Sequence, residues 1–186
     1  MAFGLAATLA RAGTRTVLVD ADLRRGRVSD LMEIPRSPGL MEVLLEEATL
    51  EEVVRATNQP RLSVITGGRR VGDPTEVITV AFEHVLTQLE GMFEAVIVDG
   101  TPVVPISDAR IISRFADATL LVVSAGATTR RQVRTAIERL SLIDVRPTAT
   151  VLNNSREAGN SSYYYEVDNT DRLREERRKD RTARTR

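Results

Sequence analysis

An α/β fold with a doubly wound, mainly parallel sheet is the architecture that this 186-residue sequence predicts. Short apolar runs rich in β-branched residues alternate along the chain with segments of helical periodicity, which is the pattern of strands connected by helices. The runs are apolar throughout, as expected for strands that are covered on both faces. Two of them end in aspartate, and open parallel sheets bind ligands at the carboxyl ends of their strands.

Strands are expected where short apolar runs stand between turn residues. These runs are residues 16–20, 62–66, 95–99, 118–124 and 148–152. Amphipathic spacing predicts helices over residues 2–12, 39–48, 50–56, 74–89, 108–115 and 128–141. Gly13 is the expected C-terminal cap of the first helix. Asp73 is the expected N-cap of the helix that begins with Pro74.

The composition predicts one folded domain at residues 1–155 and a disordered tail at residues 156–186. With 42% apolar residues the chain can bury a sizeable core, whereas the tail is polar, charged and carries a cluster of tyrosines. The absence of cysteine excludes disulfides, thiolate metal sites and cysteine nucleophiles, and the single His84 excludes a multi-histidine metal site. A formal net charge of zero argues against a nucleic-acid partner.

Paired carboxylates at the end of a predicted strand carry the first chemical signal. In the stretch VLVDADLRR, an apolar strand delivers Asp20 and Asp22 to its carboxyl end. Two carboxylates there can hold Mg²⁺ or its water ligands, and one can orient or deprotonate an attacking hydroxyl. The alternative interpretation of the motif is a strand followed by an ordinary turn that contains aspartate.

A second acidic strand end makes the chemical interpretation more specific. The stretch VIVDGTP places Asp99 at the end of another apolar strand, before a Gly-Thr-Pro turn. A single aspartate in this position is the usual second magnesium partner in phosphate-loop enzymes. The two motifs together, with helices and a strand between them, favour a nucleotide-binding site at the carboxyl edge of the sheet.

With these motifs the chain resembles the bacterial tyrosine kinases of capsule and exopolysaccharide synthesis, the BY-kinases. The likeness runs almost collinearly over residues 2–165. It includes GLAATLARAG, VLVDADLRRG (the family's Walker A-prime motif), SPGLMEVL, LSVITGG, DPTEVI, VIVDGTPVVPISDA, ADATLLVVSAGAT, TVLNN and the tyrosine cluster. Partitioning and septum-site ATPases share the general fold and the acidic motifs. The Asp-Leu-Arg-Arg continuation, the DPTEVI segment and the terminal tyrosines favour the kinase branch.

The resemblance implies a use of ATP and Mg²⁺ and a role for each site residue. Asp20 is expected near the attacking tyrosine hydroxyl, Asp22 as a ligand of magnesium-bound water, and Asp99 as the Walker B magnesium partner. Arg24 and Arg25 are expected near the nucleotide phosphates or a neighbouring subunit, and Asn153 near the base. The expected phosphoacceptors are Tyr163, Tyr164 and Tyr165.

Three departures from the family pattern stand out. Gly26 replaces the proline that follows the two arginines, which we expect to matter little, and the Asp-Thr-Pro-Pro turn is altered to Asp-Gly-Thr-Pro after Asp99. The family's first strand and its Walker A phosphate loop do not precede residue 2, and the only lysine is Lys179. Losing three or four charge-assisted hydrogen bonds from that loop costs roughly 6 kcal/mol, or about four decades in ATP affinity.

From the missing loop we expect an incomplete P-loop kinase or ATPase domain whose gene was read from an internal start codon. Reading the upstream DNA in the same frame tests this expectation. The expected function is an autophosphorylating protein-tyrosine kinase that regulates polysaccharide synthesis, inactive as written if the loop is absent. The alternatives are a partitioning-type ATPase and a non-catalytic binding module of the polysaccharide machinery.

The resemblance also implies a cellular setting. The expected partner is a membrane-embedded activator of polysaccharide chain length or export, which would hold a cytoplasmic kinase at the inner face of the membrane. The chain is further expected to form homo-oligomers whose copies phosphorylate one another's tails in trans.

Overall fold

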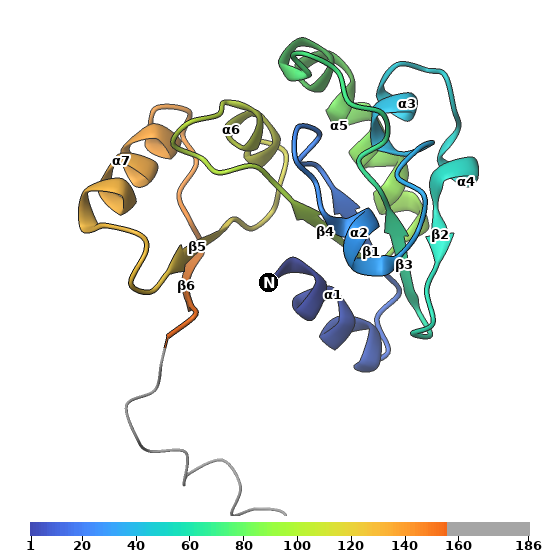
Figure 1. The fold of residues 1–186 in the computed structure, drawn as a ribbon, viewed down its shortest axis with the longest axis horizontal. Coiled ribbons are helices and arrows are strands. Elements are labelled where there is room, and N and C mark those ends of the chain that lie inside the picture. The colour runs from blue at the N-terminus through green and yellow to red at the C-terminus, as the bar shows by residue number, and fades with distance from the viewer. Residues whose placement is uncertain (156–186) are drawn as a thin grey trace, which may run out of the picture.

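The computed structural model describes residues 1–155, so the predicted tail and Tyr163, Tyr164 and Tyr165 lie outside the described residues. Helices and strands alternate as expected (Figure 1). The helices are α1 (Ala2–Arg11), α2 (Val28–Met32), α3 (Leu40–Leu44), α4 (Leu50–Val53), α5 (Thr75–Met92), α6 (Asp108–Ser113) and α7 (Arg130–Ser141). The strands are β1 (Thr16–Asp20), β2 (Arg55–Ala56), β3 (Leu62–Ile65), β4 (Ala95–Asp99), β5 (Leu120–Ser124) and β6 (Ala149–Asn153).

The strands form two sheets. One has the order β2-β3-β1-β4, in which β1 runs parallel to both β3 and β4 and only β2 is antiparallel. The other consists of the parallel pair β5 and β6. The predicted mainly parallel α/β class is confirmed. Among the described residues, however, β4 does not pair with β5, so the strands form two separate sheets.

The core explains why the strand runs are apolar throughout. Val17 and Val19 of β1 pack on one face against α3 and α5, while Leu18 packs on the other face against α1 and α2. Because β1 lies between β3 and β4 and is covered on both faces, all five of its residues are buried. This arrangement places the end of β1, and hence Asp20, in the buried core.

All five predicted strands are confirmed to within two residues at either end, whereas the helices match less closely. The predicted helix over residues 50–56 is wrong at its end, because the backbone of Val54 is extended and Arg55 and Ala56 pair with β3 as β2. The short helix α2 was not predicted. Gly13 does follow the α1 C-cap with a positive φ of 100°. Asp73 is not the N-cap of α5, which is Pro74, but it accepts a hydrogen bond from the Thr75 backbone N–H at 3.1 Å.

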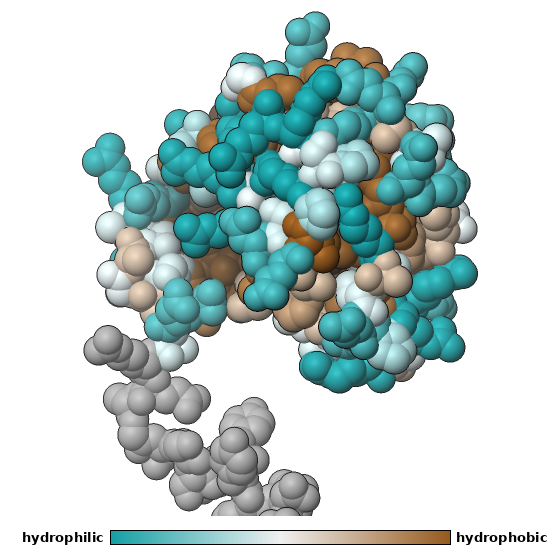
Figure 2. Space-filling model, turned by 45° about the vertical axis from the view of Figure 1, so that its right-hand side comes forward, coloured by the Kyte–Doolittle hydropathy of each residue, from teal (hydrophilic) through white to brown (hydrophobic). Residues whose placement is uncertain are grey.

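A hollow of about 720 Å³ separates β4 from β5. Its walls include Val96 and Val98 of β4, Leu121 of β5 and Leu140 of α7, and apolar residues show inside it in Figure 2. The β5 residue Val122, which also faces it, is 46% exposed. Apolar side chains of β4 and β5 therefore face the hollow from both sides.

Among residues 1–155, no helix has the length and the apolar composition that a membrane crossing requires.

Candidate active site

The three predicted aspartates lie at one edge of the four-stranded sheet. Asp20 ends β1 and Asp99 ends β4, and the two residues are direct partners in the parallel ladder. The backbone N–H of Ala21 donates to the carbonyl of Asp99 at 2.9 Å, so the ladder continues to the start of the loop that carries Asp22. The sequence-based expectation that the two acidic motifs meet is therefore confirmed at the level of the backbone.

Asp20 is turned inward rather than toward solvent, and its side chain is only 1% exposed. Its Oδ2 accepts a hydrogen bond from the Val28 N–H at 3.2 Å, and its Oδ1 accepts one from the Asp22 N–H at 3.3 Å. Burial raises the pKa of Asp20 to about 6, although the Val28 N–H and the positive charge of Arg36 act in the opposite direction. A carboxylate with this pKa is suited to exchange a proton near neutral pH.

Gly26 makes the inward position of Asp20 possible. A Cβ atom added at Gly26 would lie 2.3 Å from Asp20 Oδ2 and 2.4 Å from its Oδ1, which is closer than atoms can approach. A proline or alanine here therefore requires the carboxylate of Asp20 to move from this position. The expectation that the exchange of proline for glycine matters little stays a prediction.

Asp22 and Asp99 are the carboxylates that a metal ion could reach. Asp22 is half-buried and uses Oδ1 to accept a hydrogen bond from the Arg25 N–H at 2.8 Å. Asp99 is exposed at the rim, and crowding by protein atoms, followed by repulsion from Asp22, raises its pKa. Among residues 1–155 no three acidic or histidine side chains form a ready-made metal site. Mg²⁺ commonly binds one or two carboxylates together with phosphates and water, and Asp22 and Asp99 fit that mode.

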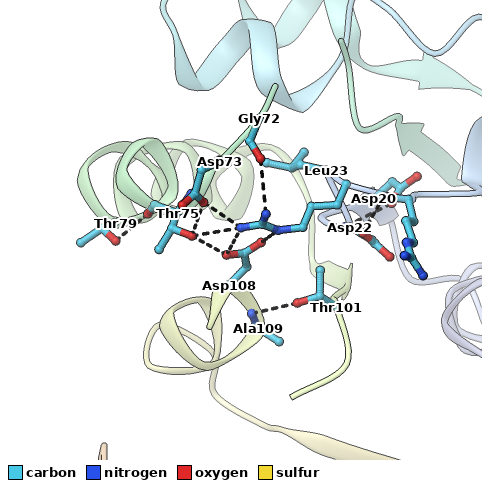
Figure 3. Close-up of polar contacts among 12 residues, drawn as sticks. Asp20, Asp22, Leu23, Gly72, Asp73, Thr75, Thr79, Thr101, Asp108 and Ala109 are labelled. Carbon is cyan, nitrogen blue, oxygen red and sulfur yellow. Dashed lines mark hydrogen bonds and ion pairs between the residues drawn. The ribbon is translucent and has the colours of Figure 1, made fainter. Parts of the chain in front are cut away.

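Arg24 connects the loop after β1 to the starts of α5 and α6, where its partners Asp73, Thr75 and Asp108 lie (Figure 3). Its Nε donates to Asp108 Oδ2 at 2.9 Å, and its NH2 donates to Asp73 Oδ1 at 2.7 Å. Asp108 is fully buried and also accepts a hydrogen bond from Thr75 Oγ1 at 2.9 Å. The guanidinium is thus already engaged by protein groups. The expected contact of Arg24 with nucleotide phosphates stays a prediction. Such a contact would compete with the bonds to Asp73 and Asp108.

The same cluster reaches the loop after β4. Asp108 begins α6, and the next residue, Ala109, donates its N–H to Thr101 Oγ1 at 3.3 Å (Figure 3). Thr101 lies two residues after Asp99 and is buried. Through Arg24, Asp108 and Thr101, the loops that carry Asp22 and Asp99 are tied to the same helix. The role of Asp108, left open by the sequence, is to hold this connection.

Arg36 is a site residue that the sequence analysis did not find. Its guanidinium donates to the carbonyls of Gly26 at 2.8 Å, Leu23 at 3.1 Å and Gly68 at 2.7 Å. Two of these carbonyls belong to the loop after β1, so Arg36 fixes that loop from one side while Arg24 fixes it from the other. No sequence motif marks an arginine that acts on backbone carbonyls.

Asn153 is the predicted site residue that lies apart from the aspartates. It ends β6 in the second sheet, is paired with Ser124, and accepts a hydrogen bond from the Ala125 N–H at 2.8 Å through its backbone carbonyl. It belongs to the carboxyl edge of its own sheet, on the other side of the hollow. Its expected contact with a nucleotide base stays a prediction.

The raised pKa of Asp20 predicts a pH-dependent effect of Asp20→Asn on stability. Because the folded-state pKa of about 6 exceeds the ordinary value of 3.8, the contribution of Asp20 is fully present below 3.8 and is lost as the pH rises through 6. Asparagine cannot ionise, so the variant should gain about 2 kcal/mol relative to the wild type between about pH 4.5 and about pH 8. Urea unfolding of both proteins across this range measures the difference, and a pH-independent difference would contradict the inward, desolvated carboxylate.

Comparisons with known proteins identify relatives of this chain. The chain is 33% identical over 150 residues to the tyrosine-protein kinase ptk of Acinetobacter johnsonii, covering 80% of this chain and 20% of that protein. It is 30% identical over 165 residues to the tyrosine-protein kinase YwqD of Bacillus subtilis, covering 88% of this chain and 70% of the relative. The chain thus spans a fifth of the first relative and over two thirds of the second. No protein-family profile matches the chain.

Solved structures agree with these relatives. The kinase domain of the Escherichia coli tyrosine kinase ETK superposes with a TM-score of 0.81 at 28% identity, covering 88% of this chain and 65% of that one. The chimerical protein CapA2B2 gives a TM-score of 0.80 at 29% identity, with coverages of 84% and 70%. The septum site-determining protein MinD of Pyrococcus horikoshii, solved with Mg-ADP, gives 0.65 at 17% identity with coverages of 81% and 62%, which shows a shared fold alone. The acidic strand ends, the sheet and these likenesses together establish that the chain belongs to the family of bacterial tyrosine-protein kinases.

Proposed function

We propose that this protein transfers the γ-phosphoryl group of ATP to tyrosine in the control of polysaccharide synthesis. In this reaction the tyrosine oxygen forms a bond to the γ-phosphorus, the bond from that phosphorus to the ADP oxygen breaks, and the phenol proton passes to a carboxylate. The observation that carries the proposal is the pairing of Asp20 with Asp99 at the carboxyl edge of adjacent parallel strands. Kinship with tyrosine-protein kinases supplies the reaction class.

Each carboxylate has a proposed part in the transfer. Asp22 and Asp99 would hold Mg²⁺, which neutralises charge on the nucleotide phosphates when it is bound. Asp20 would accept the proton of the tyrosine, which its pKa of about 6 permits near neutral pH. Since Asp20 is 1% exposed, a substrate hydroxyl can reach it only when the loop around Gly26 opens. Arg24 and Arg36 would hold that loop in register between openings.

Tight ATP binding needs groups that the described residues do not supply. A glycine-rich loop provides backbone N–H groups, a lysine and a hydroxyl to the phosphates. The hollow between β4 and β5 is where a strand leading to such a loop would complete the sheet, because both of its walls are strand edges with apolar side chains. Full activity would then depend on a segment that fills this hollow.

The proposed partner is a membrane-embedded activator of polysaccharide chain length or export, and the proposed location is the inner face of the membrane. The likeness to the chimerical protein CapA2B2 and to kinases named for capsule systems supports a place in that machinery. Homo-oligomers that phosphorylate one another's tyrosines are part of the same proposal.

Incubation with Mg-ATP of the chain carrying a strand and a glycine-rich phosphate loop joined to the start of α1, followed by detection of phosphotyrosine, tests the proposed function. Labelling that disappears in the Asp99→Asn variant is the expected result. Hydrolysis of ATP without tyrosine labelling would favour the partitioning-type ATPase. Absence of both reactions, together with no measurable nucleotide binding, would favour a non-catalytic binding module.

A further inference from the structure

Glu42 of α3 is a buried carboxylate that forms no ion pair among residues 1–155. Its oxygens accept hydrogen bonds from Ser37 Oγ at 2.6 Å, the Gly39 N–H at 2.8 Å and the Arg69 N–H at 3.0 Å. Although burial by itself would raise the pKa of Glu42, these hydrogen bonds lower it. Glu42 is therefore a buried negative charge that three neutral donors stabilise.

Capping a helix does not require this arrangement. α4 has a glutamate at the same third position, Glu52, which is exposed and accepts one backbone N–H at 2.8 Å. Glu42 accepts the equivalent bond from Gly39, the N-cap of α3, and accepts two more from Ser37 and Arg69. Ser37 belongs to the segment before α3, and Arg69 belongs to the loop after β3. Glu42 thus attaches two further segments to the helix that it caps.

Arg36 extends this connection to the acidic edge. Its Nε donates to the Gly68 carbonyl at 2.7 Å and its own carbonyl accepts the Gly68 N–H at 3.1 Å, so two bonds join these residues. The same guanidinium donates to the carbonyls of Leu23 and Gly26 in the loop after β1. The residue after Arg36 and the residue after Gly68 are the two that donate to Glu42. Glu42 therefore holds both sides of the Arg36–Gly68 pair.

The contact at this joint is close. A Cβ atom added at Gly68 would lie 2.2 Å from Glu42 Oε2, which is closer than atoms can approach. The start of α3 is bonded to the same loop, because the Leu40 N–H donates to the Thr66 carbonyl at 2.7 Å. The loop after β3 therefore cannot move away from α3 without losing its bonds to Glu42.

Resting on the proposed kinase function, we propose that Glu42 is a positioning residue for the acidic edge, which acts through Arg36 on the loop that carries Asp22. No hydrogen bond joins Glu42 to Asp20, Asp22 or Asp99 within residues 1–155, so its effect passes through the carbonyls that Arg36 binds. With this joint intact, the loops after β1 and β3 move together. With it broken, the loop after β1 opens alone and Asp22 loses its fixed position.

Amide hydrogen exchange of the full chain without nucleotide tests the proposal. The N–H groups of Gly26 and Val28 report on the loop after β1, since they donate to the Asp22 carbonyl at 2.6 Å and to Asp20 Oδ2 at 3.2 Å. Glu42→Gln replaces an acceptor oxygen by an NH2 donor that faces other donors. It should raise the exchange rates of both amides at least about tenfold.

The β4 amides separate this effect from a general loss of stability. Buried strand amides exchange through global unfolding, so they accelerate whenever a variant lowers stability. The amides of Gly26 and Val28 exchange through local opening, and they accelerate only if that opening breaks the bonds of Glu42. Faster exchange in β4 with unchanged rates at Gly26 and Val28 in the Glu42→Gln variant overturns the proposal.

Two further variants test the route and the matched control. Arg36→Lys should accelerate the loop amides as Glu42→Gln does, because one ammonium cannot replace a planar fork that binds three carbonyls. The double variant should exceed the larger single effect by less than about twofold, whereas effects that multiply in full overturn the route through Arg36. Glu52→Gln should leave the loop amides unchanged. If Glu42→Gln does not fold, Ser37→Ala removes one donor alone and should accelerate them roughly threefold.

The dependence of tyrosine phosphorylation on Mg²⁺ tests the positioning role in the chain with the added strand and phosphate loop. Glu42→Gln should raise the Mg²⁺ concentration at half-maximal rate about fivefold, and Glu52→Gln should not change it. Loss of folded protein would lower the maximal rate without this shift. An unshifted Mg²⁺ dependence with faster loop exchange confines Glu42 to the fold and overturns its positioning role. Absence of phosphotyrosine in every chain removes the kinase reaction, while exchange still decides the joint.

Discussion

Joining a β-strand and a glycine-rich phosphate loop to the start of α1 is expected to raise the affinity for Mg-ATP by about four decades. The added strand should enter the hollow between β4 and β5, where it gains two parallel neighbours and covers apolar side chains such as Val122. Its loop then reaches the start of α1, next to the edge that carries Asp99. The backbone N–H groups, lysine and hydroxyl of the loop supply three or four charge-assisted hydrogen bonds, worth roughly 6 kcal/mol together.

Isothermal titration with Mg-ATP measures this gain in affinity. Two controls test whether the gain comes from the loop and whether the added strand occupies the hollow. A graft whose loop lysine is replaced by alanine should lose a large part of the affinity while keeping the added strand. Val122→Lys places a charge on a wall of the hollow and should block the graft, whereas Val80→Lys, on the far helix α5 and 79% exposed, should not. A graft that binds ATP equally well with Val122→Lys would show that the strand does not occupy the hollow.

The strands were predictable because each is a continuous apolar run, and burial on both faces is what makes such runs necessary. The elements that the sequence did not reveal are short. The helix α2 has five residues and β2 has two, which is too few for either periodicity to appear. Arg55 and Ala56 continue an apolar helical pattern, and only pairing with β3 turns them into a strand.

The candidate site likewise has features that the sequence predicts and features that only the structure shows. The meeting of Asp20 and Asp99 follows from the rule that parallel strands end at a common edge, so sequence alone reaches it. The carboxylate of Asp20 turns inward and occupies the space where a Cβ at Gly26 would lie. No residue pattern encodes this close approach. Arg36 and Asp108 act through carbonyls and buried partners supplied by distant turns. Their roles appear only when the chain is folded.

Replacement of Asp108 by alanine is expected to cost about 3–4 kcal/mol of unfolding free energy, a large fraction of the stability of an ordinary domain. Asp108 is fully buried and joins Arg24 at 2.9 Å to Thr75 at 2.9 Å. Its loss leaves a guanidinium that is only 29% exposed without its main partner. Arg24→Ala should also be costly, since it leaves a buried carboxylate whose remaining hydrogen bond comes from the Thr75 hydroxyl.

The double variant decides whether the two losses share one cause. If Arg24 and Asp108 act as a pair, Arg24→Ala with Asp108→Ala should cost about 2 kcal/mol less than the sum of the single changes. The exposed pair of Arg69 and Glu47, at 2.7 Å, is the matched control and should show a coupling under about 1 kcal/mol. Urea unfolding at neutral pH gives all of these values. Additive losses for Arg24 and Asp108 would mean that the loops carrying Asp22 and Asp99 are positioned independently, and the guanidinium would then be free to serve the nucleotide.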